Sequence, residues 1–162
     1  MQMHPETRYT IEDVVDYFLS KESMTPKKLQ RLLYYAYCWT LTLLNGSVDQ
    51  IHYKLFDDPI EAWMYGPVVP NIYYKYFRLS DPLQIPSRKN FDESVFPPEV
   101  LDVLNQVWEE YGWCSAELLD SFSRSEDPWI KARHGIPFYM PYREQISDRV
   151  IFEYFTKQMA GE

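Results

Sequence analysis

Residues 25–45 set the strongest limit on the possible folds of this chain. Thr25 is expected to cap a helix, and Pro26 takes the first helical position, where a missing N–H breaks no intrahelical bond. One stripe at helical spacing consists of Leu29, Leu32, Leu33, Ala36, Thr40, Leu43 and Leu44. Because tyrosines and a tryptophan occupy the other faces, this helix is expected to be packed on several sides. The sequence therefore predicts a mainly α fold built round a long central helix, about 25–45, with Asn45-Gly46 as its left-handed exit.

The length and composition predict one compact domain. A chain of 162 residues can bury a sizeable core, and 46% hydrophobic residues with 5 glycines are typical of a folded protein. We expect a single domain over 1–162, with a loose lead at 1–8. Residues 79–97, which contain three prolines, are expected to form a long irregular connection.

Further signals predict shorter helices and one hairpin. Helices are expected to begin at Thr10, Pro70, Pro98, Ser115, Asp127-Pro128 (with Asp127 as N-cap) and Ser147. Residues 51–65 alternate in polarity on either side of the turn signal Asp57-Asp58-Pro59, which predicts a small β-hairpin that Gly66-Pro67 ends. A short helix over 59–64 is the alternative.

Four segments share the order and spacing of a known family. The first two are Thr25-Pro26-Lys27-Lys28-Leu29-Gln30-Arg31-Leu32-Leu33-Tyr34-Tyr35-Ala36 and Ile60-Glu61-Ala62-Trp63-Met64-Tyr65-Gly66-Pro67-Val68-Val69-Pro70. The later two are Glu126-Asp127-Pro128-Trp129 and the amphipathic stretch from Ile151 to Phe155. With these motifs the chain resembles the Panacea domain, also called the SocA-like antitoxin family, over nearly its whole length.

We interpret the motif residues as the scaffold of this family. They are Leu29, Leu32, Leu33, Tyr34, Tyr35, Glu61, Ala62, Trp63, Gly66, Pro67, Glu126, Pro128 and Trp129. Gly66 is expected to allow close packing or a positive φ, and Trp63 is expected to anchor the hairpin on the central helix.

The candidate toxin contacts lie on the helix expected after Pro70. They are Tyr73, Tyr74, Tyr76 and Phe77, which crowd nearly all sides of one short helix. Some of these rings must therefore be exposed, and Tyr34, Tyr35 and Trp63 could join them. The alternative is that the rings pack on the adjacent hairpin.

The residues offer little for catalysis. The histidines are scattered at His4, His52 and His134, and no nucleophile motif or phosphate-binding glycine loop occurs. A Cys114–His134 pair is conceivable, but a structural cysteine is the simpler interpretation. Ser123-Arg124 stand where the family usually has Thr-His, and an arginine replaces neither a base nor a metal ligand. We expect no enzymatic activity, no cofactor and no bound metal.

The charge and the cysteines limit the partners and the compartment. A net charge of −8 argues against a general nucleic-acid binder and suits a basic protein partner. Lys27, Lys28 and Arg31 are interpreted as the solvated face of a helix. Cys38 and Cys114 are far apart, and neither a signal peptide nor a membrane-spanning run is recognised. A cytoplasmic protein with reduced thiols and no membrane contact is expected.

The resemblance implies an antitoxin, which neutralises a toxin that is usually encoded beside it. The family's toxins include nucleotide- or tRNA-modifying enzymes that stop translation. Direct inhibition through a protein–protein interface is the main hypothesis. The alternatives are a proteolytic adaptor that delivers the toxin to a protease, and an enzyme that reverses the toxin's modification. Self-association stays open.

Overall fold

A computed structural model describes residues 9–79 and 83–161 of the chain, and the loose lead predicted at 1–8 lies outside them. In this part of the chain seven α-helices and one two-stranded antiparallel sheet form, which confirms the mainly α prediction. The helices are α1 (Ile11–Leu19), α2 (Pro26–Leu43), α3 (Pro70–Tyr76), α4 (Pro98–Tyr111), α5 (Ala116–Arg124), α6 (Asp127–Arg133) and α7 (Asp148–Met159). The strands are β1 (Glu61–Trp63) and β2 (Gly66–Val68), and a short 3-10 helix, η1, covers Glu93–Val95.

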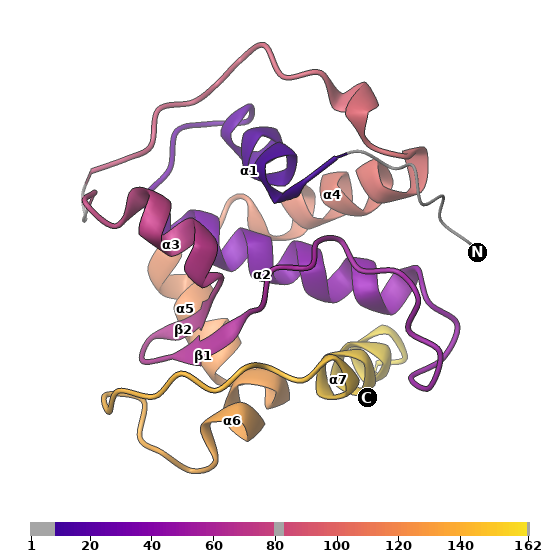
Figure 1. Cartoon of the computed structure of the whole chain (residues 1–162), viewed down its shortest axis with the longest axis vertical. Helices are drawn as coiled ribbons and strands as arrows, with labels where there is room; N and C mark the ends of the chain where they lie inside the picture. Colours follow the sequence, from indigo (N-terminus) through magenta and orange to yellow (C-terminus); the bar gives the residue numbers. More distant parts are fainter. Residues whose placement is uncertain (1–8, 80–82, 162) are drawn as a thin grey trace.

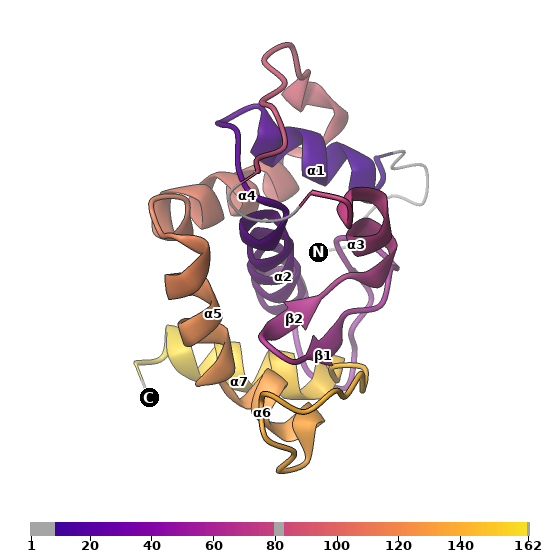
Figure 2. The ribbon, with the colours of Figure 1, turned by 90° about the vertical axis from the view of Figure 1, so that its left-hand side faces the viewer.

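The helix α2 is the centre of the molecule. In Figure 1 it crosses the middle of the molecule, and in Figure 2 it is seen nearly end on, with the other elements arranged around it. All ten side chains from Leu29 to Cys38 are buried. The prediction of a central helix packed on several sides is therefore confirmed. No helix within the described residues is long and apolar enough to cross a bilayer.

The start of α2 is as predicted, but its end is not. The Thr25 hydroxyl accepts a hydrogen bond from the Lys28 N–H at 3.2 Å, and Pro26 is the first helical residue. The helix ends at Leu43, and its C-cap Leu44 has φ −104° and ψ 13°, so the predicted left-handed exit at Asn45-Gly46 is wrong. Instead, the Asn45 side-chain amide donates to the Leu41 carbonyl at 2.8 Å and closes the last turn.

The hairpin exists, but it lies further along the chain than predicted. Its strands pair Glu61 with Val68 and Trp63 with Gly66, so Gly66-Pro67 belongs to the second strand instead of ending the hairpin. Residues 51–56 form no strand. There the Asn45 side chain replaces a partner strand, because it accepts from the N–H groups of residues 52 and 53 and donates to the Tyr53 carbonyl. The alternating polarity at 51–55 reflects burial of every second side chain.

Both edges of the small sheet are occupied. On the β1 edge, the Ala62 N–H donates to the Glu144 carbonyl at 2.8 Å, and the Ile146 N–H donates to the Ile60 carbonyl at 2.8 Å. On the β2 edge, the Pro67 carbonyl accepts from the Arg31 guanidinium at 2.7 Å, and proline has no N–H to satisfy. The sheet is thereby tied to α2 on one side and to residues 144–146 on the other.

The remaining helix starts agree with the sequence except at α6. Ser115 and Ser147 each accept a hydrogen bond from the backbone of the first helical turn. At α6 the N-cap is Glu126 and Asp127 is already helical, so the predicted cap is wrong by one residue. The described part of the 79–97 connection is irregular apart from η1, and Ile85 within it forms a β-bridge with Met24.

Candidate functional site

Arg31 lies at the junction of three elements. Its Nε donates to the Asp120 carboxylate on α5 at 2.7 Å, and its Nη1 donates to the Pro67 carbonyl on β2. The side chain is only 3% exposed, so the interpretation of this residue as part of a solvated helix face is wrong. Lys27 lies 3.2 Å from the same carboxylate, and the Lys28 ammonium donates to the Gly112 carbonyl at 2.6 Å.

Gly66 makes room for Arg31. Its φ is +153°, and a Cβ at this position would lie 2.6 Å from the Arg31 Nε. Any larger residue would therefore displace the guanidinium that bonds Pro67 and Asp120. The expectation of close packing at this glycine is confirmed, and it connects the Gly-Pro motif physically to the Lys-Leu-Gln-Arg motif.

Gln30 makes a second connection between the same two motifs. Its side-chain amide donates to the Val69 carbonyl at 3.2 Å, and its carbonyl accepts from the Val69 N–H at 2.7 Å. Both residues are buried, so this pair of hydrogen bonds satisfies the backbone N–H and carbonyl of Val69, where β2 passes into α3. Leu29, Leu32 and Leu33 lie beside it in the core with no exposed surface.

The third motif segment also meets the first two. The Glu126 carboxylate accepts from the Tyr35 hydroxyl at 3.0 Å, and the indole N–H of Trp129 donates to the Trp63 carbonyl at 2.9 Å. Pro128 and Trp129 are buried. The hydrogen bonds of Gln30, Arg31, Tyr35 and Trp129 all join segments that are far apart in the sequence. These residues therefore hold α2, the hairpin, α5 and α6 together.

The Glu126 carboxyl has unusual electrostatics. Burial raises its pKa to about 8, and the hydrogen bond from Tyr35 opposes this shift without cancelling it. Burial also raises the pKa of the Cys38 thiol, which removes its reactivity at neutral pH. These groups lie in an aromatic cluster in which Tyr35 stacks on Tyr111 with ring centroids 4.1 Å apart.

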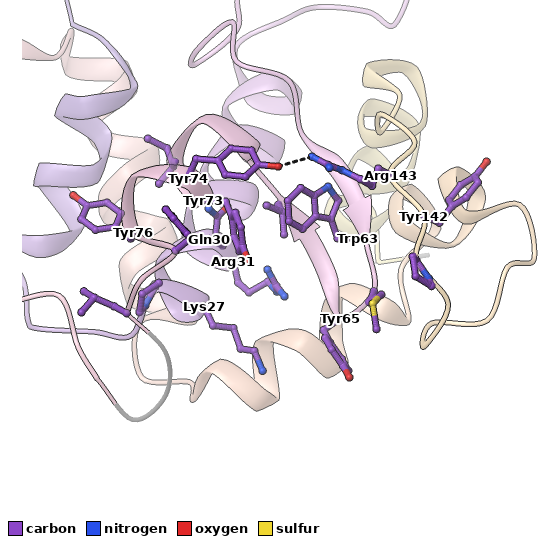
Figure 3. Close-up of a pocket in the computed structure, with 17 residues that line it drawn as sticks. Lys27, Gln30, Arg31, Trp63, Tyr65, Tyr73, Tyr74, Tyr76, Tyr142 and Arg143 are labelled. Carbon is purple, nitrogen blue, oxygen red and sulfur yellow. Dashed lines mark hydrogen bonds between the residues drawn. The ribbon is translucent and has the colours of Figure 1, made fainter.

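An open groove lies next to this frame, and we call it the aromatic groove. Its volume is about 730 Å³. It is bounded by the first turns of α2, the hairpin, α3 and residues 141–143, as Figure 3 shows. The lining residues are Pro26, Lys27, Gln30, Arg31, Trp63, Met64, Tyr65, Val68, Ile72, Tyr73, Tyr74, Tyr76, Phe77, Leu79, Pro141, Tyr142 and Arg143.

All four predicted toxin contacts line the aromatic groove. Tyr73 is 39% exposed, Tyr74 is 53% exposed and Phe77 is 52% exposed, whereas Tyr76 is half-buried. Tyr73 also packs edge-on against Trp63 with centroids 4.9 Å apart. Exposure of some of these rings was predicted and is observed, and packing on the hairpin, the alternative, is observed for Tyr73, which remains accessible.

Two other aromatic residues behave differently from the sequence expectation. Tyr34 and Tyr35 have no exposed surface, so they cannot contact a partner in this fold. Trp63 is half-buried on the groove wall, where the Arg143 guanidinium covers its ring at 4.4 Å. Arg143 also donates to the Tyr74 hydroxyl at 3.1 Å, the bond that is dashed in Figure 3.

Sequence reasoning missed Arg133 and the loop that it holds. This buried guanidinium donates to the carbonyls of Ala62, Pro137, Met140 and Tyr142 at 2.5–3.3 Å. The loop, residues 136–142, exposes Phe138, Tyr139 and Met140, and Phe138 packs on Tyr65 with centroids 6.0 Å apart. The one available signal was Gly135, which follows a left-handed residue at the end of α6.

The described residues offer no evident centre for metal chemistry. Within 9–79 and 83–161, no three His, Cys, Asp or Glu side chains are grouped to hold a metal ion. His52 and His134 are exposed on separate segments, while Cys38 and Cys114 are free and buried. At the Ser123-Arg124 position, the serine hydroxyl donates to the Asp120 carbonyl and the arginine donates to the Tyr65 carbonyl. Both side chains thus support the frame.

Comparison with protein families places the chain in a known family. The family model described as antitoxin SocA-like, Panacea domain, matches residues 29–130, which is more than half of the chain. The matched range includes the connections of Gln30, Arg31, Gly66 and Glu126, but it ends before Arg133. No curated protein and no solved structure matches the chain.

Proposed function

Because the chain belongs to the SocA-like, Panacea-domain antitoxin family, we propose that it neutralises a cognate protein toxin by binding it directly. The toxin is expected to be encoded beside it and to act in the cytoplasm, with a nucleotide- or tRNA-modifying translation inhibitor as one such class. The family assignment suggests a non-enzymatic role, and the proposed action requires neither a cofactor nor a nucleic acid.

The observation that carries this proposal is the gathering of exposed rings at one groove. Tyrosine and tryptophan dominate the binding energy of protein interfaces, and they act best in a pocket that is already formed. Tyr73, Tyr74 and Phe77 project from α3 at the rim, and Tyr65 projects from the hairpin turn. We propose these four as the main toxin contacts, with Tyr76 and Trp63 supporting them from the groove wall.

The motif residues have a different role in this proposal. Arg31, Gln30 and Gly66 fix the hairpin against α2, and α3 begins directly after the segment that Gln30 holds. The frame therefore determines where the α3 rings stand. A rigid frame reduces the ordering cost of binding, and an interface of standard size would bury about 1,600 Å² in total.

The decisive experiment is induced expression of the neighbouring gene with and without this protein, followed by co-purification. We expect growth arrest that this protein relieves, together with a stoichiometric complex. The Tyr73→Ala/Tyr74→Ala double variant should lose the rescue and weaken the complex by about 2 kcal/mol or more, roughly thirtyfold. Trp113→Ala is the matched control, because Trp113 is 73% exposed and does not line the aromatic groove.

Other outcomes would favour other mechanisms. Rescue that disappears in a protease-deleted strain would indicate a proteolytic adaptor. Rescue by substoichiometric protein in a purified reaction would indicate an enzyme that reverses the toxin's modification. A stable complex that the double variant leaves unchanged would keep the antitoxin role and place the interface elsewhere.

A further inference from the structure

The aromatic groove carries a charge opposite to that of the whole molecule. Three cationic side chains line it, Lys27, Arg31 and Arg143, and none of its lining residues within the described chain is acidic. Two neighbouring carboxylates partly offset them: Asp120 pairs with Lys27 and Arg31, and Glu61 pairs with Arg143. The whole chain has a net charge of −8. The groove is therefore a locally cationic site on an acidic protein.

A fourth cation extends this site along the hairpin turn. Arg124 donates to the Tyr65 carbonyl at 3.0 Å, and its guanidinium lies over the Phe138 ring at 5.2 Å. No carboxylate within the described residues forms a salt bridge with it. The groove and its margin thus hold four cations against the carboxylates of Asp120, Glu61 and Glu144, the last of which accepts from the Tyr142 hydroxyl at 3.2 Å.

Local charge decides which partner group can enter the groove. Screening at physiological salt limits direct interactions between exposed charges to about 8 Å. The acidic surface elsewhere can influence a distant encounter, but a group in contact with Lys27 and Arg143 experiences mainly their charge. The basic partner that the net charge suggests therefore does not fit this groove.

The arrangement of the rings favours a peptide over a single-stranded nucleic acid. Bases bind by stacking on free aromatic faces. Here the Trp63 face is covered by the Arg143 guanidinium at 4.4 Å, and its edge is packed against Tyr73. What the groove offers is apolar ring surface between two cations, which fits an apolar side chain flanked by carboxylates.

We propose that the aromatic groove binds an acidic segment of the toxin that inserts an aromatic or aliphatic side chain between α3 and the hairpin. Carboxylates of this segment pair with Lys27 and Arg143, while its apolar side chain packs against Tyr73 and Trp63. This proposal rests on the proposed function, since it specifies the chemistry of the toxin surface.

The test uses probes that do not depend on the toxin. Random copolymers of glutamate and tyrosine, and of lysine and tyrosine, are added to the full-length protein while the indole N–H resonance of Trp63 is followed by NMR. The glutamate copolymer should shift this resonance, and the lysine copolymer should not. A shift with the lysine copolymer, or with neither, overturns the proposal. A shift with oligouridylate but not with the glutamate copolymer overturns it in favour of a nucleic acid.

Charge variants make the test specific to the groove. Lys27→Gln and Arg143→Gln should each weaken binding of the glutamate copolymer on the order of tenfold. Lys157→Gln is the matched control, because Lys157 is an exposed residue of α7 that does not line the groove. An equal loss in all three variants would mean nonspecific attraction and would overturn the proposal.

The two proposals fail in distinguishable ways. If the glutamate copolymer binds in the groove but the neighbouring gene product forms no complex, the groove chemistry holds and direct neutralisation fails. If the toxin forms a complex that Lys27→Gln and Arg143→Gln strengthen, direct neutralisation holds and the acidic-segment proposal fails.

Discussion

Arg31 and Arg133 are both buried beside the same small sheet, yet they are held in different ways. Arg31 has a counter-charge, because its Nε lies 2.7 Å from the Asp120 carboxylate. Arg133 is surrounded by backbone carbonyls, four of which accept its hydrogen bonds, and within the described residues it forms no salt bridge. Arg31 is neutralised by a carboxylate, whereas Arg133 is held by carbonyl dipoles and by the rings of Trp129 and Tyr142, and its Nε has no hydrogen-bond partner among the described residues.

The difference follows from what each arginine joins. Arg31 connects regular elements, namely α2, α5 and β2, and its one backbone acceptor is the Pro67 carbonyl at the outer edge of β2. Arg133 supplies donors to residues 136–142, a loop whose carbonyls have no helix or strand to pair with. A charge pair therefore fixes the frame, while an arginine with several donors takes the place of secondary structure in the loop.

The largest effect is expected from removal of the counter-charge. Asp120→Ala leaves the Arg31 guanidinium buried without a carboxylate, so the free energy of unfolding should fall by about 3–5 kcal/mol. Denaturant titration followed by circular dichroism measures this loss. The double variant Arg31→Met/Asp120→Leu should recover part of it, because it removes both charges together.

Lys27→Gln is the control for this prediction. Lys27 pairs with the same carboxylate, but its side chain is 34% exposed. Its loss should lower the free energy of unfolding by only about 0.2–1 kcal/mol. Equal losses in the Asp120 and Lys27 variants would show that burial of the Arg31 pair has no special importance for the frame.

A smaller and more local effect is expected at the second arginine. Arg133→Met removes the donors to four carbonyls but leaves no unpaired charge, so the loss should be about 1–3 kcal/mol. Hydrogen exchange should accelerate in residues 136–142, while α2 and α5 keep their protection. Lys131→Met, an exposed substitution on the same helix, should leave the exchange of the loop unchanged. Uniform acceleration throughout the protein would contradict a local role for Arg133.

The smallest effect concerns the partly buried Glu126 carboxyl, which forms no salt bridge with a cation in the part of the chain that the structure describes. Asp120 has two cationic neighbours, whereas Glu126 has the Tyr35 hydroxyl. The pKa of Glu126 is about 8 in the folded protein against an ordinary value of 4.5. Between these values the folded state holds a proton that the unfolded state has released, so stability must fall as the pH rises from 5 to 8.

Comparison with Glu126→Gln isolates this contribution. The wild-type protein should lose about 1–2 kcal/mol more than the variant between pH 5 and pH 8, because partial solvent access screens the shift. Thermal unfolding at several pH values in the same buffer series provides the measurement. Parallel stability profiles for the two proteins would refute a raised pKa at this carboxyl.

The sequence predicted helices better than it predicted the hairpin. Helix starts at Thr25, Ser115 and Ser147 depend on local hydrogen bonds, which the sequence contains in full. The hairpin was misplaced because the extended segment at 51–56 takes its hydrogen bonds from the side chain of Asn45. A period of two in the sequence reveals side-chain burial, but it does not identify the backbone partner.

In the candidate site, the exposed rings could be predicted from the sequence, but the contacts of the arginines could not, because their partners are distant in the chain. The crowding of aromatic residues after Pro70 indicated exposed rings, and three of the four are exposed. The burial of Arg31 was missed, because helical periodicity places a charge beside Lys27 and Lys28 without revealing Asp120 on a distant helix. Arg143 had no local signal and Arg133 had only Gly135 after its helix, since their partners are carbonyls and rings brought close by the fold.

The occupied edges of the small sheet have a consequence for aggregation of the protein. A strand with unpaired backbone groups is a template on which another copy can add its own strand and start aggregation. Here residues 144–146 cover one edge, and Pro67 with the Arg31 guanidinium closes the other. Among the described residues, this sheet therefore presents no free edge on which another copy could add a strand.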